Sequence, residues 1–416
     1  MIGRTLVIAL LVLAAAAPAA VAAPWSAPRS LTVAGSAGQP AVALGAPDLA
    51  AVAYVRTVNG EQWVELRRGT IGTLGAPVLL DRDRRPGLDS PALTFDGAVD
   101  LVAWRRLRHV PNQEPTRVIA LASVGRSGAA SAPRELTGPP NAYDPRLPTP
   151  QLLVFNRRTT AYVTELQDRR VQGTTRLPAG ATFDVEVARL ADGTLLAVWP
   201  QSGVVFSATK APGALAFGAA TRLSTGGYAR SPSLAVTTDG HAVAVWTQSD
   251  ASGRALLAAA RPPGGTFGAS TVLAPPSAEA LSTQAIATTA GDVFVTYVSS
   301  AQFAGAGPLR ALRVAPDGLP ATSVRTLTAP GERTHEVSLA VDSGAGYAAW
   351  STAGRGRRSV RVVRVAPGAL VGTVRTVSAA DDVQSAPPAF AMTADGRALI
   401  AYATKGNRIR LVTRAG

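Results

Sequence analysis

The sequence predicts an all-β fold, a β-propeller of about eight four-stranded blades, from a repeated pair of strands and from complementary chain ends. The repeat is clearest at 231–246, where an apolar run, the turn Asp239-Gly240 and a second apolar run lead to Trp246. Repeats of this length that contain several short strands are typical of propellers. Aromatic residues equivalent to Trp246 recur every 37 to 58 residues, at Tyr54, Trp104, Tyr162, Trp199, Trp246, Tyr297, Trp350 and Tyr402.

The first two strands of a repeat are joined by a tight turn that contains glycine. Asp-Gly between apolar runs predicts a type I′ hairpin, in which both central residues have positive φ. The second strand is an almost continuous apolar run, which is typical of a strand buried on both faces. The aromatic residue at its end is therefore expected to pack between blades. Asp-Gly occupies this turn at Asp96-Gly97, Asp192-Gly193, Asp239-Gly240 and Asp395-Gly396.

The two ends of the chain predict how the ring closes. Residues 25–31 share an apolar–small–apolar pattern with 217–223 and 267–273, which are expected to be fourth strands. The chain ends just after 409–413, a segment that resembles a third strand. We therefore expect the N-terminal strand to pair with the last blade and to leave no open sheet edge at the seam. Seven blades are the alternative if the third repeat forms none.

The third repeat, at about 147–184, is predicted to be degenerate, with as few as three strands. Only 37 residues separate Tyr162 from Trp199, which is too few for the usual complement. The segment 138–150 contains five prolines, and proline is not compatible with a central strand. This segment is expected to be a stiff surface connection, and the first strand of the repeat is expected to begin at Gln151.

Residues 1–23 are predicted to be a secretory signal peptide and 24–416 a single propeller domain. Arg4 precedes the apolar run 6–17, and small residues at 20–23 provide a cleavage site. An uncleaved membrane anchor is the alternative, and no other stretch is apolar for long enough to span a bilayer. A chain of 416 residues without cysteine cannot form disulfides or thiolate metal sites. These features indicate a secreted bacterial protein, at the cell exterior or envelope, and we expect a monomer.

The formal net charge of +14 predicts attraction to anionic partners. Candidate partners are an anionic glycan, a cell-envelope polymer or a protein. Lys210 and Lys405 are the only lysines, and the arginines are spread over many repeats without a long basic run. This pattern indicates a general positive field, and it does not favour nucleic acid as the partner.

Polar residues collect in the connections between repeats, which in a propeller surround one mouth of the channel. The simplest explanation is that charges occupy loops because the strands are apolar. The functional alternative is a pocket for an anionic or sugar-like ligand. Its candidate residues are Arg85, Tyr143, Asp144, Tyr228, Arg230, Arg333 and His335.

Catalytic motifs are absent from the sequence, and neither a cofactor nor a metal is predicted. His109, His241 and His335 lie in different repeats without metal-ligand spacing. The sequence therefore favours a non-catalytic binding or scaffold protein. The alternative is a glycan-acting hydrolase or lyase with its active site at the channel mouth. It would need two carboxylates about 5 to 10 Å apart, for which the candidates are Asp144, Glu332, Asp381 and Asp382.

The repeat resembles those of secreted bacterial β-propellers in the broad sialidase-like group, over nearly all of 25–416. The shared features are a strand, Asp239-Gly240, a strand that ends at Trp246, and an aromatic–glycine strand such as the one at Phe217. The resemblance implies the propeller fold. The group's Asp-box is Ser-x-Asp-x-Gly-x-Thr-Trp, whereas Asp239 and Gly240 are adjacent. No residue here can be matched to the sialidase arginine clamp or nucleophile.

Overall fold

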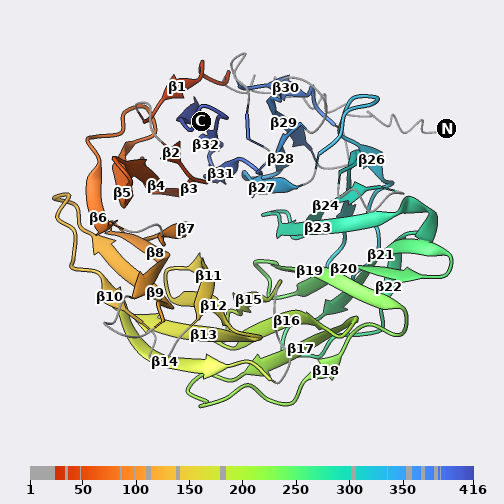
Figure 1. The fold of residues 1–416 in the computed structure, drawn as a ribbon. Helices are drawn as coiled ribbons and strands as arrows, with labels where there is room; N and C mark the ends of the chain where they lie inside the picture. Colours follow the sequence, from red (N-terminus) through yellow and green to blue (C-terminus); the bar gives the residue numbers. More distant parts are fainter. Residues whose placement is uncertain are drawn as a thin grey trace, which may run out of the picture.

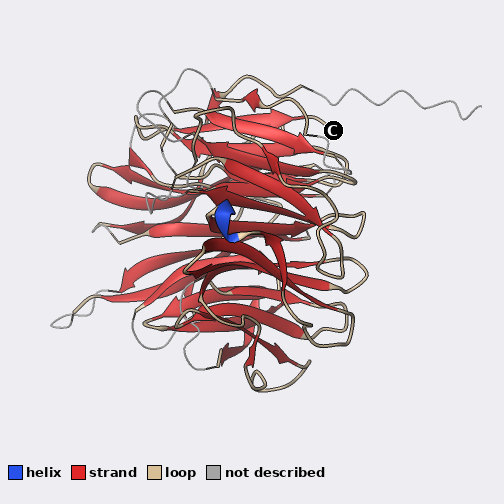
Figure 2. Ribbon diagram, turned by 90° about the vertical axis from the view of Figure 1, so that its right-hand side faces the viewer, coloured by secondary structure: helices blue, strands red, loops and turns tan. Residues whose placement is uncertain are grey.

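The computed structural model shows an eight-bladed β-propeller, as predicted, so the seven-bladed alternative is wrong. The blades are antiparallel sheets arranged in a ring around a central channel (Figure 1). Seen from the side, the described elements are almost entirely strands, with one short 3-10 helix, η1 (Pro276–Ala278) (Figure 2). The structure describes residues 24–32, 36–46, 48–84, 87–97, 99–108, 114–136, 141–178, 184–300, 306–334, 336–352, 358–366, 371–378, 383–384 and 386–416. The predicted signal peptide lies outside these residues.

In blades 1 to 7 the strands run from the channel outward in chain order, and in blade 8 the outermost strand comes from the N-terminal end of the chain (Figure 1). Blade 1 has five strands because its innermost strand is divided into two pieces, which both pair with the next strand. Blades 1 and 2 consist of β2 (Ser36–Ala37), β3 (Ala41–Gly45), β4 (Leu49–Val58), β5 (Glu61–Thr70) and β6 (Val78–Asp83), then β7 (Asp89–Asp96), β8 (Val99–Arg108), β9 (Thr116–Val124) and β10 (Arg134–Glu135). Blades 3 and 4 consist of β11 (Ala142–Thr149), β12 (Leu152–Arg157), β13 (Thr160–Gln167) and β14 (Arg170–Arg176), then β15 (Glu186–Arg189), β16 (Leu195–Gln201), β17 (Val204–Lys210) and β18 (Thr221–Arg222).

The remaining four blades repeat the same order. Blades 5 and 6 consist of β19 (Tyr228–Val236), β20 (Ala242–Asp250), β21 (Gly253–Arg261) and β22 (Thr271–Ala274), then β23 (Ala280–Ala287), β24 (Val293–Ser299), β25 (Leu309–Val314) and β26 (Arg325–Thr326). Blades 7 and 8 consist of β27 (Val337–Val341), β28 (Gly346–Ser351), β29 (Val360–Val365) and β30 (Arg375–Thr376), then β31 (Ala389–Met392), β32 (Ala398–Ala403), β33 (Ile409–Arg414) and β1 (Arg29–Ser30).

The ring closes as predicted, because the N-terminal strand β1 is the fourth strand of blade 8. Arg29 pairs with Leu411 and Ser30 with Arg410, antiparallel to β33. Backbone hydrogen bonds continue the ladder on both sides, from Ser26 N to Thr413 O at 2.7 Å and from Leu31 N to Ile409 O at 2.8 Å. Figure 1 shows red β1 beside the blue C-terminal strands. Closure therefore pairs the edge that β33 would otherwise expose.

Apolar packing between neighbouring blades holds the ring together. Each core cluster combines side chains of adjacent blades, as when Tyr54 of blade 1 packs with Leu399 and Leu411 of blade 8. Burial of these side chains removes apolar surface from water, which is the main favourable term in folding. Seven of the eight predicted anchors lie on second strands and are at most 1% exposed: Tyr54, Trp104, Trp199, Trp246, Tyr297, Trp350 and Tyr402.

The prediction of an incomplete third blade is wrong. The sheet β11–β12–β13–β14 has all four strands, and Tyr162 lies on the third strand rather than the second. The true anchor is Phe155, which is 1% exposed and stacks on Tyr162 with ring centroids 5.6 Å apart. Gln151 lies in the turn before the second strand, and the proline-containing segment forms the first strand, β11. An innermost strand is an edge strand, so its prolines interrupt no ladder on the channel side.

The glycine turns between first and second strands also differ from the predicted type I′ form. At Thr237–His241 the glycine Gly240 has φ of +89°, whereas Asp239 is not in the left-handed region. Gly240 N donates to Thr237 O at 3.0 Å, and Thr237 N donates to His241 O at 2.9 Å. This pattern is a type I turn followed by a left-handed glycine, which needs positive φ at one position only. The turns around Gly193, Gly291 and Gly396 have the same pair of bonds.

Candidate ligand site in the central channel

The central channel contains a polar cavity of about 600 Å³. Its lining comes from the first strands of blades 3 to 8 and from the residues that lead into them. These strands are innermost in their sheets, so their residues form the wall of the channel. The polar side chains of the lining include Arg146, Asp184, Glu186, Gln284 and Glu336.

Arg146 on β11 is the centre of a cluster of carboxylates. Its Nη1 donates to Glu186 Oε1 at 3.2 Å, and its Nε lies 3.8 Å from Asp144 Oδ2. Asn156 Nδ2 donates to the same oxygen of Asp144 at 3.4 Å. Arg146 Nε and Nη2 are shielded from water and have no hydrogen-bond partner among the described residues. The guanidinium therefore holds the cluster together and retains hydrogen-bonding capacity.

Local backbone geometry brings these side chains together. Asp144 and Asp184 have φ of +54° and +55°, a left-handed conformation that aspartate tolerates better than most residues. The pairing of β11 with β12 shifts register on both sides of Arg146. Asp184 lies two residues before β15, which begins at Glu186, and this turn leaves the two carboxyl groups close enough for Asp184 to affect the pKa of Glu186. The four side chains of the cluster therefore lie at or near the points where the connections between blades enter the first strands: Asp144, Arg146, Asp184 and Glu186.

The protein raises the pKa values of two of these carboxyl groups. Burial raises the pKa of Glu186, and the nearby Asp184 and Asp144 add to the effect, while Arg146 opposes it. Burial likewise raises the pKa of Asp184, against the opposing effect of Arg146. The side chain of Glu186 is still 36% accessible, because it faces the channel rather than the packed core. Protein surrounds these carboxyl groups closely enough to disfavour charge, yet a ligand in the channel can reach them.

The electrostatics of the cavity do not favour an anionic group. One guanidinium faces three carboxyl groups, on Asp144, Asp184 and Glu186, and Glu336 adds a fourth to the wall. An anion would experience like-charge repulsion in this setting. A sugar hydroxyl can donate to a carboxylate and accept from Arg146 at the same time. The arrangement therefore suits a neutral, hydroxyl-rich ligand.

Several hydroxyl groups on the inner strands tie neighbouring blades together. Ser233 Oγ accepts from Ala285 N at 2.9 Å, and Ser338 Oγ donates to Pro388 O at 2.7 Å. Thr283 Oγ1 donates to Ser231 O across the same boundary as Ser233. These bonds link the first strands of neighbouring blades around the channel.

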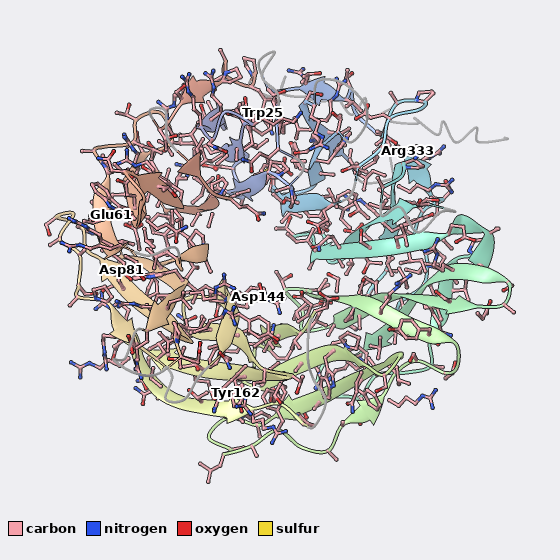
Figure 3. The ribbon with its side chains drawn as sticks, in the orientation of Figure 1. Trp25, Glu61, Asp81, Asp144, Tyr162 and Arg333 are labelled. Carbon is pink, nitrogen blue, oxygen red and sulfur yellow. The ribbon has the colours of Figure 1, made fainter. Side chains whose placement is uncertain are left out.

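The structure does not gather the predicted site residues into one pocket. Asp144 lies at the edge of the channel, whereas Arg333 lies far out on the ring (Figure 3). Tyr143 Oη donates to the backbone oxygen of Arg158, and burial raises the pKa of its hydroxyl. Tyr228 is 58% exposed, and the Arg230 guanidinium lies 6.0 Å from its ring centroid. Arg85 and His335 lie outside the described residues.

The carboxylates expected of an enzyme are also dispersed. Glu332 Oε1 accepts from Trp350 Nε1 at 2.9 Å and lies 3.8 Å from Arg361 Nε, so it serves an aromatic anchor. Asp381 and Asp382 lie outside the described residues. Of the two candidates that the structure describes, Asp144 belongs to the channel cluster, where it is close to Arg146, and Glu332 does not.

Sequence reasoning missed Asp184, Glu186 and the central role of Arg146. The available signal was the short spacing of Asp184 and Glu186, which keeps their two carboxylates close along the chain. Among the described residues, the channel cluster included, no group of three or more histidine or acidic side chains is arranged to hold a metal ion. No helix in the described part of the chain is long and apolar enough to cross a membrane.

No family model matches the chain, and no curated protein matches it. The structure is similar to the Dos1 propeller, with 10% identity and a TM-score of 0.54 over 94% of this chain and 95% of that one. It is also similar to the α-L-arabinanase of Penicillium chrysogenum complexed with arabinobiose, with 10% identity and a TM-score of 0.43 over 79% and 93% of the chains.

A third similar structure is a neuraminidase-like protein of A/little yellow-shouldered bat/Guatemala. It is 12% identical, with a TM-score of 0.37 over 66% of this chain and 93% of that one. Sialidase-like and arabinanase propellers are thus among the structural neighbours. At these identities the likeness concerns the fold, and of the three only the Dos1 propeller has a TM-score above 0.5.

Proposed function

We propose that this protein is a secreted, non-catalytic binding propeller, which holds a glycan or glycan-bearing envelope polymer at the mouth of its channel. The observation that carries the proposal is the cavity of about 600 Å³ in which Arg146 stands among carboxyl groups. The Arg146 side chain is 30% exposed, and its Nη1, which already donates to Glu186, carries a second hydrogen for a ligand. In this proposal the ligand enters the channel through its hydroxyl groups, because the cavity carries an excess of carboxylates.

Binding through hydroxyl groups makes use of each feature of the cluster. Glu186 accepts a hydroxyl proton, and Arg146 donates to the oxygen of a neighbouring hydroxyl. Such paired hydrogen bonds to charged groups contribute about 1.5 to 3 kcal/mol each.

The test is affinity electrophoresis of residues 24–416 in gels that contain soluble starch, mixed-linkage β-glucan or xylan. We expect at least one polymer to retard the protein. Glu186→Gln and Arg146→Gln should each weaken that retardation about tenfold, because each removes a charge-assisted hydrogen bond. Glu114→Gln is the matched control, since Glu114 is exposed in a loop outside the cavity.

The outcome also separates binding from catalysis. Polymer that binds and keeps its length, with no new reducing ends or unsaturated products, supports the proposal. New reducing ends would favour the hydrolase alternative, and unsaturated ends would favour a lyase. Retardation that Glu186→Gln and Arg146→Gln leave unchanged would exclude the channel as the binding site.

A further inference from the structure

The groove between blades 7 and 8 contains a second, smaller pocket that is lined by three arginines. Its volume is about 180 Å³, and its lining includes Arg364, Arg375, Arg414, Tyr347 and Trp25. Trp25 lies between these two blades (Figure 3). The space equals about six water molecules at about 30 Å³ each, so it admits one small group rather than a polymer.

Strand geometry brings the three arginines to the same groove. Arg364 and Val362 are two residues apart on β29, so both project to the same face of blade 7. Arg375 on β30 pairs with Val362 and shares that face. Arg414 on β33 approaches the groove from blade 8. These residues are far apart in the sequence, which is why no basic run marks the pocket.

The floor of the pocket is a buried network that holds Arg414 in place. Arg414 is 6% exposed, and its Nη1 donates to Tyr347 Oη at 2.8 Å. Tyr347 Oη in turn donates to Asp342 Oδ2 at 2.8 Å. Asp342 Oδ1 accepts from Gly344 N at 3.0 Å and Ala345 N at 2.7 Å. Burial opposes ionisation of Asp342, but these donors hold its pKa below its usual range.

The pocket retains an excess of positive charge. Three guanidinium groups face one carboxylate, and the oxygens of Asp342 are already engaged. Arg364 Nε lies 4.0 Å from Asp342 Oδ2, and its side chain is 47% exposed. Arg375 is exposed and makes no hydrogen bond or ion pair with the described residues. Arginine matches the planar, bidentate geometry of carboxylates, sulfates and phosphates.

We propose that this pocket binds an oxyanion carried by a sugar-sized ligand, such as the charged substituent of an acidic glycan. Arg375 and Arg364 contact the oxyanion at the mouth, and Arg414 supplies fixed positive charge at the floor. The site is distinct from the channel, where carboxylates predominate. It gives a specific location to the attraction for anions that the net charge predicts.

The neighbouring groove shows that such a pocket does not follow from the repeat alone. Arg313 of blade 6 occupies the position of Arg364, but it is 1% exposed and its Nη1 contacts both oxygens of Asp292, at 2.7 and 2.6 Å. Its charge is therefore neutralised. Arg325 of blade 6 has the strand position of Arg375 and is equally exposed. It provides a matched control in a groove whose inner arginine is paired.

The experiment is isothermal titration calorimetry of residues 24–416 with glucose 6-phosphate, glucose 6-sulfate, glucuronate and glucose. We expect the charged sugars to bind and glucose not to bind, and the order of affinity will identify the preferred oxyanion. Arg375→Gln and Arg364→Gln should each weaken binding about tenfold, because each removes a charge-assisted bond. Arg325→Gln should change the affinity less than twofold.

Two results would overturn the proposal. One is the absence of binding of any charged sugar at low salt. The other is an equal loss in Arg325→Gln and Arg375→Gln, which would indicate a general field rather than a pocket. Thermal unfolding of each variant checks the fold. Both test side chains are exposed, so we expect their substitution to leave the fold intact. Glu186→Gln should leave this binding unchanged, so failure here and failure of the proposed channel function can be told apart.

Discussion

Asp100 illustrates how single charged residues are accommodated between blades. Its carboxylate is fully buried, and Arg68 Nε of the preceding blade lies 2.7 Å away. Burial nevertheless raises the pKa of Asp100 to about 6, against the opposing effect of Arg68. The short contact and the raised pKa are compatible, because loss of hydration at a buried carboxylate can exceed the attraction of its partner.

This pKa leads to a prediction about stability and pH. A carboxyl group with a raised pKa in the folded state binds its proton more tightly there, so its contribution to stability falls as pH rises from about 4 to about 6. Asp100→Asn removes this titration. Between pH 4 and pH 7, the free energy of unfolding of the wild type should fall by about 2 kcal/mol relative to Asp100→Asn.

Urea unfolding at both pH values measures this difference. The comparison uses only its change with pH, so any constant effect of Asn beside Arg68 cancels. Glu114→Gln serves as the control, because Glu114 is exposed in a loop. A wild-type-minus-Asn difference that stays the same at pH 4 and pH 7 would show that Asp100 titrates normally.

At the scale of elements, the closing strand is short and depends on its flanking residues. β1 contains two residues, yet Leu31 beside it is 8% exposed and packs in the cluster that joins blades 8 and 1. Its N–H donates to Ile409 O at 2.8 Å. Arg29 adds a contact to the next blade, where its Nη1 donates to Gly72 O at 2.5 Å. The seam is thus held by side-chain packing as much as by the ladder.

We predict that Leu31→Ala destabilises the protein by about 2 to 4 kcal/mol, because it leaves a cavity in the cluster at the seam. Leu215→Ala is the matched control. Leu215 is 95% exposed, so the same substitution should change stability by less than about 0.5 kcal/mol. Differential scanning calorimetry of both variants gives the comparison. Equal midpoints for the two variants would mean that the seam does not limit stability.

At the scale of the whole molecule, the ring is closed and the two described ends of the chain lie next to each other. Trp25 forms a bridge with Arg414, so a short linker can join residues 416 and 24. The loop 262–266 connects the third and fourth strands of blade 5 and has mostly exposed residues. Cutting there would leave one strand at the new N-terminus and three at the new C-terminus, which is the arrangement that blade 8 has now.

We predict that this circular permutant folds and unfolds in a single transition, because every pair of neighbouring blades is kept. Calorimetry provides the test, with the linear chain 24–416 as reference. Two separate transitions would show that the natural seam is required for cooperativity. Failure of the permutant to fold would show that blade 5 cannot replace blade 8 as the closing blade.

The sequence predicted the ring because packing between blades repeats the same chemistry seven times. It failed at blade 3, where Phe155 and Tyr162 face each other across a hairpin and the pattern could not decide which was the anchor. It also took the prolines of β11 for a loop, because pattern alone does not distinguish an edge strand from a connection. Both errors arose because the sequence alone does not show which strands pair with each other.

Candidate ligand residues were harder to predict. The distance of a residue from the channel depends on the position of its strand within the blade and on the direction in which its side chain points. Arg333 and Asp144 both follow fourth strands in the sequence, yet only Asp144 reaches the channel. The pocket of Arg364, Arg375 and Arg414 unites residues from two blades and three strands. Sequence spacing gives no direct measure of such proximity.

The seam also has a consequence for biosynthesis. Among the described strands β1 is translated first and its partner β33 last. Blades 1 to 7 can each be completed as their strands emerge, whereas β1 must wait, unpaired, for almost the whole chain. A chain that ended before β33 would have an unpaired N-terminal segment that is accessible to proteases. Closure of the ring therefore has to wait until β33 has been translated.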